Sequence, residues 1–186
     1  MNKVVFFSHN LHKIREVKKI LKSKKFKVLT LVEFPKIIEP LENGKTFNEN
    51  AIIKSSFGFN KFSLPCFADD SGICVSALNN RPGIYSKRFV QKNGGYKKTF
   101  QVIIKEAKKE KNFNAFFQTN IALTISTKNT ICFEGIIPGS ISIKPLGSKG
   151  FHYDPIFIPE GTNKTFAQMS VEEKNDISHR AKAIRK

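Results

Sequence analysis

The chain has 186 residues, of which 40% are hydrophobic and 25% are charged. This composition is typical of one globular domain with a sizeable core, and it excludes an intrinsically disordered chain. The formal net charge is 32 − 15 = +17 and comes almost entirely from lysine. Such an excess favours polyanionic partners, namely nucleic acid, a phosphorylated metabolite or an anionic membrane surface, although compositional drift toward Lys, Asn, Ile and Phe is an alternative explanation.

The cysteines and the N-terminus bear on the compartment of the protein. Cys66, Cys74 and Cys132 lie far apart without C-x-x-C spacing, so they indicate neither a disulfide framework nor a zinc site. The apolar run Val4–Phe7 is too short for a signal peptide, and no stretch approaches the roughly 18 apolar residues of a membrane span. We therefore expect a cytoplasmic protein without a membrane partner.

The N-terminal part of the chain alternates between strand and helix patterns. Buried strands are predicted at residues 4–7, 26–31 and 64–68, and helices at residues 11–21 and from residue 46 through residue 57. Asn10 precedes the first helix, and Thr46 with Glu49 has the spacing of a capping box for the second. The third strand is predicted to end at Asp69 and Asp70.

The C-terminal part is richer in strand patterns. The predicted elements are a helix at 96–111, a hairpin of 115–126 with 130–137, a short strand at 155–159, and a helix after the capping box of Ser170 and Glu173. This order predicts an α/β fold with a mixed central β-sheet flanked by helices, arranged as two lobes with a cleft between them. Because no repeat or separable linker interrupts the pattern, residues 1–186 are expected to form a single nucleotide pyrophosphatase domain of two lobes, an assignment that takes its function from the resemblance described below.

Two adjacent carboxylates, Asp69 and Asp70, follow the apolar residues 64–68. In a partly dry environment two like charges need a cation, and Mg²⁺ is commonly held by one or two carboxylates together with substrate phosphates. Residues Ser8 to Lys13 follow the first strand and open a helix, which offers backbone N–H groups and a lysine to a phosphate. The alternatives are a polar turn at the Asp pair and a simple N-cap at Asn10.

Five segments recur in order along almost the whole chain. They are Ser8-His-Asn10 with Lys13, Thr46 to Ala51 with Lys54, Ala68 to Gly72 through Pro82-Gly-Ile-Tyr-Ser86, Gly150 to Pro155, and Glu173 to Arg180. Together these segments resemble the inosine-triphosphate pyrophosphatase family. The resemblance implies hydrolysis of non-canonical purine nucleoside triphosphates such as ITP, dITP and XTP to the monophosphate and pyrophosphate. It also implies Mg²⁺, with Mn²⁺ as an alternative, and a homodimer without a specific nucleic-acid partner.

The resemblance further implies roles for individual residues. Asp70 would be the catalytic carboxylate, acting on the water that attacks the α-phosphorus, and it would bind metal with Glu42, for which Glu39 is the alternative. The substrate-binding residues would be Ser8, His9, Asn10, Leu11, His12, Lys13 and Lys54 at the phosphates, Ser71 and Lys174 near the nucleotide, Phe151, His152, Tyr153 and Asp154 near the base, and His179 and Arg180 at its 6-keto edge. An Arg that only donates hydrogen bonds would reject the amino group of adenine.

The sequence departs from the family pattern at two places. Ser8-His9 stands where a Thr usually begins the first loop, which keeps the hydroxyl and adds an imidazole. His152 replaces a glycine, so a side chain enters where the backbone is expected to approach the base. This change could narrow or shift base specificity.

Other interpretations of the same residues stay open. Phe151 and Tyr153 are also typical of aromatic residues in a core. His179-Arg180 is also typical of the basic end of a helix. Lys54 and Lys174 are also typical of lysines exposed to solvent. A basic nucleic-acid-binding module is a second candidate function, although the lysine-dense residues 18–27 and 105–111 predict outer helix faces. A pyrophosphatase for modified pyrimidine nucleotides is a third.

Overall fold

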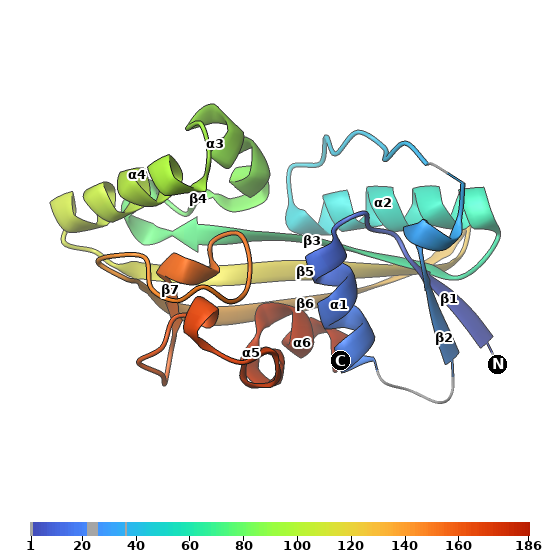
Figure 1. Cartoon of the computed structure of the whole chain (residues 1–186). Helices are drawn as coiled ribbons and strands as arrows, with labels where there is room; N and C mark the ends of the chain where they lie inside the picture. The colour runs from blue at the N-terminus through green and yellow to red at the C-terminus, as the bar shows by residue number, and fades with distance from the viewer. Residues whose placement is uncertain (1, 22–25, 36) are drawn as a thin grey trace. The chain divides into compact units, whose positions relative to one another are not determined.

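The computed structural model describes residues 2–21, 26–35 and 37–186 (Figure 1). The helices are α1 (Leu11–Ile20), α2 (Phe47–Phe62), α3 (Ser86–Lys92), α4 (Tyr96–Lys109), α5 (Val171–Ile177) and α6 (His179–Ile184). The strands are β1 (Asn2–Phe6), β2 (Phe26–Thr30), β3 (Cys66–Val75), β4 (Arg81–Pro82), β5 (Asn114–Ser126), β6 (Asn129–Ile141) and β7 (Phe157–Pro159).

The strands pair in the order β2-β1-β3-β5-β6-β7, with β4 beside β3. Strand β1 is parallel to β2 and β3, whereas β4 and β7 pair antiparallel to their neighbours. The predicted mixed sheet is therefore confirmed, and so are the predicted strands 115–126 and 130–137, which correspond to the neighbours β5 and β6.

The described residues form two compact units. The first comprises residues up to Asp70 with Thr119–Gly135 and Arg180–Lys186, and the second comprises Ser71–Gln118 and Ile136–His179. Strands β3, β5 and β6 each contribute residues to both units. The two units agree with the two lobes expected from the sequence, while the assignment of residues 1–186 to a single functional domain stays a prediction.

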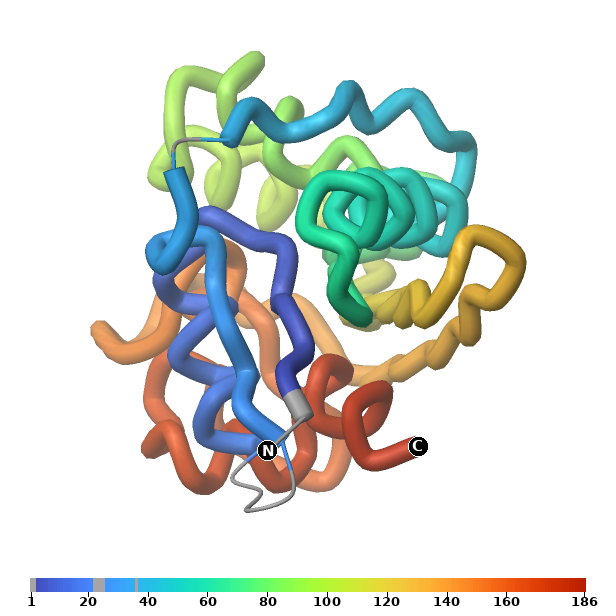
Figure 2. The backbone as a smooth tube through the Cα atoms, turned by 90° about the vertical axis from the view of Figure 1, so that its right-hand side faces the viewer, coloured from blue at the N-terminus to red at the C-terminus, as the bar shows by residue number. Residues whose placement is uncertain are grey.

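Strand β1 organises the core of the first unit because successive side chains of a strand point to opposite faces. On one face Phe6 packs with Ile14 and Val17 of α1 and with Ala183 of α6. On the other face Val5 and Phe7 lie in a cluster that α2 completes with the partly buried Phe59 and Phe62. Figure 2 shows α1 and α2 on different sides of β1. Burial on both faces explains why this strand reads as a continuous apolar run.

Helix α4 covers the core of the second unit. Its predicted inward residues are all buried, namely Phe100, Ile103, Ile104 and Ala107. Three of them pack with Ile73 and Val75 of β3 and with an aromatic group formed by Phe117, Phe157 and Phe166. The 3.6-residue spacing of apolar side chains therefore predicted this helix and its orientation correctly.

The end of the third strand was predicted wrongly. Strand β3 does not stop at the Asp pair but continues through Asp69, Asp70, Ser71 and Gly72 to Val75. A strand can carry two consecutive carboxylates because their side chains point to opposite faces, where each finds its own partners. The interpretation of the Asp pair as a polar turn is therefore wrong.

The helix predicted after Ser170 is two helices. Helix α5 begins at the predicted capping box, in which Glu173 N donates to Ser170 Oγ (3.1 Å) and Ser170 N donates to Glu173 Oε2 (2.6 Å). Ser178 has an extended backbone (φ −63°, ψ 154°) and ends α5, and α6 starts at His179. His179 and Arg180 thus lie at a helix start, so the interpretation of this pair as a basic helix end is wrong.

A glycine lets the turn around Gly83 approach β3. The Oγ of Ser86 donates to Gly83 O (2.7 Å) and accepts from Ile73 N (3.1 Å). A Cβ at Gly72 would overlap Gly83 O and lie 2.6 Å from Ser86 Oγ. We expect Gly72→Ala to lower the free energy of unfolding by about 1–3 kcal/mol through overpacking. Urea denaturation measures this change, and an unchanged midpoint would show that the turn relaxes freely.

Candidate functional site

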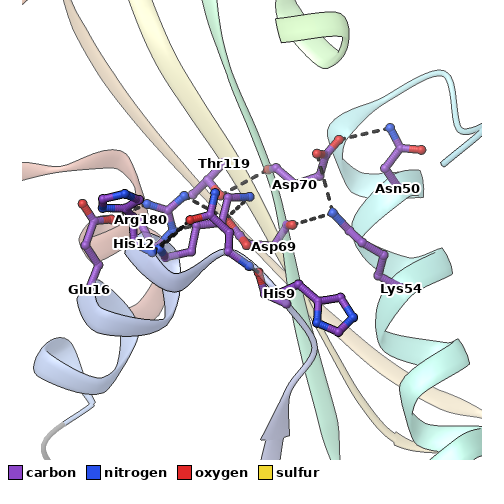
Figure 3. A network of polar contacts seen from close by, with 12 residues as sticks. His9, His12, Glu16, Asn50, Lys54, Asp69, Asp70, Thr119 and Arg180 are labelled. Carbon is purple, nitrogen blue, oxygen red and sulfur yellow. Dashed lines mark hydrogen bonds and ion pairs between the residues drawn. The ribbon is translucent and has the colours of Figure 1, made fainter. Parts of the chain in front are cut away.

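Asp70 lies on the face of β3 that α2 covers, and two residues of α2 approach its carboxylate (Figure 3). Asn50 Nδ2 donates to Asp70 Oδ2 (3.0 Å), and Lys54 Nζ lies 3.7 Å from Oδ1. Asn50 and Lys54 are four residues apart and therefore share one face of the helix. Asp70 is only 6% exposed, and this burial raises its pKa although Lys54 and Lys13 act to lower it. A carboxylate with a raised pKa is suited to accepting a proton.

Lys54 is buried and links three oxygen groups. Its Nζ donates to Asp69 O (2.7 Å), and it lies 2.9 Å from Glu42 Oε1 in addition to its contact with Asp70. Burial acts to lower the pKa of Lys54, but Asp70 and Glu42 outweigh it, and the resulting pKa is raised. Lys54 is therefore a charged member of the site, and its interpretation as a solvated lysine is wrong.

Asp69 points to the opposite face of β3, where two other cations hold it. Lys13 Nζ lies 3.0 Å from Asp69 Oδ2, and Arg180 donates to the same oxygen from Nε (3.1 Å) and Nη2 (2.9 Å). Arg180 Nη1 also pairs with Glu16 of α1. Burial lowers the pKa of Lys13, and Asp69 opposes this effect. The two carboxylates of the Asp pair thus tolerate each other because each has its own cationic partners.

The loop before α1 is organised by Asn10. Its Oδ1 accepts hydrogen bonds from His12 N (3.0 Å) and Lys13 N (3.2 Å), which confirms the predicted N-cap. Ser8 Oγ accepts from Asn10 N (3.2 Å). The cap therefore uses two N–H groups that the phosphate-binding hypothesis had assigned to substrate, whereas Leu11 and the side chain of His12 are exposed.

The structure separates the two glutamates proposed for metal binding. Glu42 pairs with Lys54 beside Asp70, whereas Glu39 Oε1 accepts from His9 N (3.4 Å). The carboxylates of Glu42 and Asp70 both face the ammonium group of Lys54, and hard oxygen donors around a cation suit Mg²⁺. In the described ranges no group of three or more His, Cys, Asp or Glu side chains could hold a metal ion. Two carboxylates nevertheless fit Mg²⁺, which keeps waters and phosphates as its other ligands.

A second polar cluster, in the second unit, centres on Asp154. The Oδ2 of Asp154 accepts from Phe151 N (2.7 Å) and pairs with Lys174 Nζ (2.6 Å), and both charged side chains are buried. The same Nζ lies 4.4 Å from the centre of the Phe151 ring. Gly150 has φ +75°, and a Cβ there would overlap Asp154 Oδ2. The Gly-Phe-x-Tyr-Asp spacing is thus explained by a loop that folds back, so that Asp154 accepts from Phe151 N and lies against Gly150.

The other aromatic residues of this cluster have different environments. Tyr153 is buried in the core, and its hydroxyl donates to Ser86 O (2.7 Å). This contact confirms the interpretation of Tyr153 as a core aromatic. His152 is exposed, stacks on Tyr96 with ring centres 5.6 Å apart, and meets the ring of Phe151 edge to face. Its φ of +56° is the left-handed conformation that glycine adopts freely.

The left-handed backbone at His152 predicts that some substitutions there lower the free energy of unfolding more than others. We expect His152→Val to lower the free energy of unfolding by about 1–2 kcal/mol, because a β-branched residue is disfavoured at positive φ. The matched variant His152→Asn loses the same ring but tolerates this conformation, so its effect should be less than half as large. Equal losses in thermal or urea denaturation of the two variants would assign the effect to the lost stacking alone.

The two residues predicted to read the base are both buried. His179 stacks on Phe117 with ring centres 4.8 Å apart and an interplanar angle of 8°. Arg180 is 1% exposed and is engaged with Asp69 and Glu16. Ser71 is partly exposed in β3. Base reading by His179 and Arg180 stays a prediction, whereas Arg180 donates to the carboxylates of Asp69 and Glu16.

Three residues of the polar network around Asp69 and Asp70 were not predicted. Asn50 lies four residues before Lys54 and Glu16 lies three residues after Lys13, so helical spacing alone could have found both. Thr119 Oγ1 donates to Asp70 O (3.2 Å) from β5, and no local pattern indicates this contact (Figure 3).

None of the helices in the described part of the chain is long and apolar enough to span a membrane.

Comparison with known proteins places the chain among nucleotide hydrolases. A family model described as the Ham1 family matches residues 4–186. A dITP/XTP pyrophosphatase of Gluconobacter oxydans is 40% identical over 98% of this chain and 88% of that protein. The Bacillus subtilis protein of the same name is 36% identical over 100% of this chain and 95% of its own length.

Solved structures agree with this comparison. A HAM1 protein from Coxiella burnetii superposes with a TM-score of 0.89 at 34% identity, covering 100% of this chain and 95% of that one. The Staphylococcus aureus Ham1 protein superposes with a TM-score of 0.87 at 35% identity, covering 99% and 95%. With a match of this extent in both sequence and structure, the chain belongs to the Ham1 family.

Proposed function

We propose that this protein hydrolyses the non-canonical purine nucleoside triphosphates ITP, dITP and XTP to the monophosphate and pyrophosphate, and so removes them from the nucleotide pool. The observation that carries this proposal is Asp70, a buried carboxylate of raised pKa held beside Asn50 and Lys54. The substrate class is supported by relatives named dITP/XTP pyrophosphatase that are about 40% identical over 98% of the chain.

The reaction assigns a distinct task to each residue around Asp70. Asp70 accepts a proton from the water that attacks the α-phosphorus, and pyrophosphate leaves. Asn50 fixes one carboxylate oxygen by its hydrogen bond to Oδ2, so the carboxylate keeps one orientation. Lys54 and Lys13 supply positive charge against the phosphate oxygens, whose negative charge must be stabilised during transfer.

Glu42 and Asp70 would hold Mg²⁺, with Mn²⁺ as the alternative. When bound, the ion neutralises charge on the phosphate oxygens. The fit is supported by the two carboxylates that converge on Lys54, because Mg²⁺ is commonly held by one or two carboxylates together with phosphates and waters. Glu42 is favoured over Glu39 because Glu39 contacts His9 instead.

We assign the base to the cluster of the second unit. Phe151 and His152 offer aromatic surface, while Asp154 and Lys174 fix the loop that carries them. His179 and Arg180 remain the hypothesis for reading the 6-keto group, although the contacts of Arg180 support a role in positioning Asp69.

The resemblance also leads us to propose a cytoplasmic homodimer. Sedimentation velocity of the purified protein tests the dimer, and a single species at the monomer mass would remove this part of the proposal.

A substrate panel tests the proposed function. Pyrophosphate release is measured from ITP, dITP, XTP, ATP, GTP, dUTP and CTP, with Mg²⁺ and with chelator. We expect metal-dependent release from ITP, dITP and XTP, with ATP and GTP far slower. Release biased toward dUTP or CTP would favour the pyrimidine alternative, and activity unaffected by chelator would refute the role of Mg²⁺.

A further inference from the structure

The irregular segment of residues 37–45, which we call the strap, places Glu42 beside Lys54. Glu42 Oε1 lies 2.9 Å from Lys54 Nζ. Within the strap Ile38 is 83% exposed and Leu41 is 76% exposed. These side chains gain little from burial, so the position of Glu42 depends on its contact with Lys54 and on the contacts at the two ends of the strap.

The C-terminal end of the strap is bound to the first turn of α2. Gly44 N donates to Asn50 Oδ1 (2.8 Å), and Lys45 N donates to Glu49 Oε2 (2.7 Å). Asn50 also donates to Asp70 through Nδ2. One amide side chain therefore connects this end of the strap to the carboxylate opposite Glu42.

The N-terminal end of the strap is bound by His9. The ring Nε2 of His9 lies 3.0 Å from Ile37 O, and because a carbonyl only accepts, Nε2 carries the hydrogen and donates. His9 N donates to Glu39 Oε1 (3.4 Å), and the side chain of Ile37 is partly buried. Pro40 fixes its own φ and restricts Glu39 to an extended conformation. Pro40 thus reduces the freedom of the chain between Ile37 and Glu42.

We propose that His9 is a positioning residue that holds Glu42 in place through the strap and so sets the affinity of the site for its metal ion. The inference rests on the proposed function, in which Glu42 and Asp70 hold Mg²⁺. In this proposal the His9 side chain binds the strap and not the substrate phosphates. Removing a direct hydrogen-bond partner of a metal ligand typically weakens metal binding by about 10- to 100-fold. His9 acts on Glu42 through the backbone of the strap, so we expect an effect at the lower end of this range.

The test compares four full-length proteins: wild type, His9→Ala, His9→Gln and Ile38→Ser. Gln restores a side-chain N–H donor of similar reach, and Ile38→Ser changes an exposed residue of the same strap. Binding of Mn²⁺ alone is measured by electron paramagnetic resonance of the free ion. Cleavage of the strap after Glu42 by a glutamate-specific protease is followed without metal, since Pro40 blocks cleavage after Glu39, and thermal denaturation checks that each variant is folded.

We expect His9→Ala to weaken Mn²⁺ binding by about tenfold and to speed strap cleavage, while His9→Gln and Ile38→Ser stay within about twofold of wild type. The proposal is overturned if His9→Ala matches wild type in either measurement, or if wild type binds no Mn²⁺. Failure of the proposed function is seen separately, as wild type that binds Mn²⁺ but does not hydrolyse dITP.

Discussion

Asp70→Asn is expected to reduce kcat for dITP hydrolysis by about a thousandfold, because general-base catalysis typically contributes 10²- to 10⁴-fold and the amide cannot accept the proton. The substitution also removes one of the two carboxylates assigned to Mg²⁺. Steady-state pyrophosphate release at saturating dITP and Mg²⁺ measures the loss. Residual activity above a few per cent of wild type would refute the role of Asp70.

The fold should survive this substitution. An Asn at position 70 still offers an oxygen to Asn50 Nδ2, and Lys54 keeps its contacts with Glu42 and Asp69 O. Asp176→Asn removes the same charge from an exposed position of α5 and should leave kcat within about twofold, in line with the small effect of most surface substitutions. A large loss of stability in Asp70→Asn would make its activity uninformative, so urea denaturation accompanies the assay.

Arg180→Met is expected to lower the free energy of unfolding by about 3–5 kcal/mol, the usual consequence of breaking a buried ion pair from one side. Asp69 and Glu16 are both buried, and each would lose its contact with the guanidinium group. Arg185→Met removes an exposed arginine just after α6 and should cost less than about 0.5 kcal/mol. Equal urea midpoints for the two variants would contradict the buried network.

A compensated variant makes this prediction more specific. Adding Glu16→Gln to Arg180→Met neutralises the carboxylate that loses its guanidinium partner, while Asp69 keeps Lys13, so this double variant should recover part of the stability. Activity separates the two roles considered for Arg180. A positioning role lowers kcat/KM for dITP and dATP alike, whereas base reading brings the two values closer together.

Local patterns predicted most of the secondary structure because their causes are local. The apolar run at Val4–Phe7, the Asn10 cap and the capping box of Ser170 with Glu173 each need only neighbouring residues. The continuation of β3 through the Asp pair could not be predicted in this way. Its carboxylates are stabilised by Lys13, Lys54 and Arg180, which come from distant elements.

The candidate site shows the same difference between local patterns and contacts of distant residues. The resemblance points to Asp70, Lys54 and Lys13, and the structure places Lys54 beside Asp70 and Lys13 beside Asp69. The contact of Glu16 with Arg180 and that of Thr119 with Asp70 O join residues 164 and 49 positions apart, so no local pattern indicates them. Such contacts depend on how the helices and strands pack, and the local patterns of a single sequence do not record that packing.

The products formed from dITP and dATP by the purified protein test the central claim most directly. With Mg²⁺ present, we expect dIMP and pyrophosphate in equal amounts, and a kcat/KM for dITP at least about a hundredfold above that for dATP. Comparable rates for the two substrates, or release of orthophosphate with dIDP, would contradict the assignment.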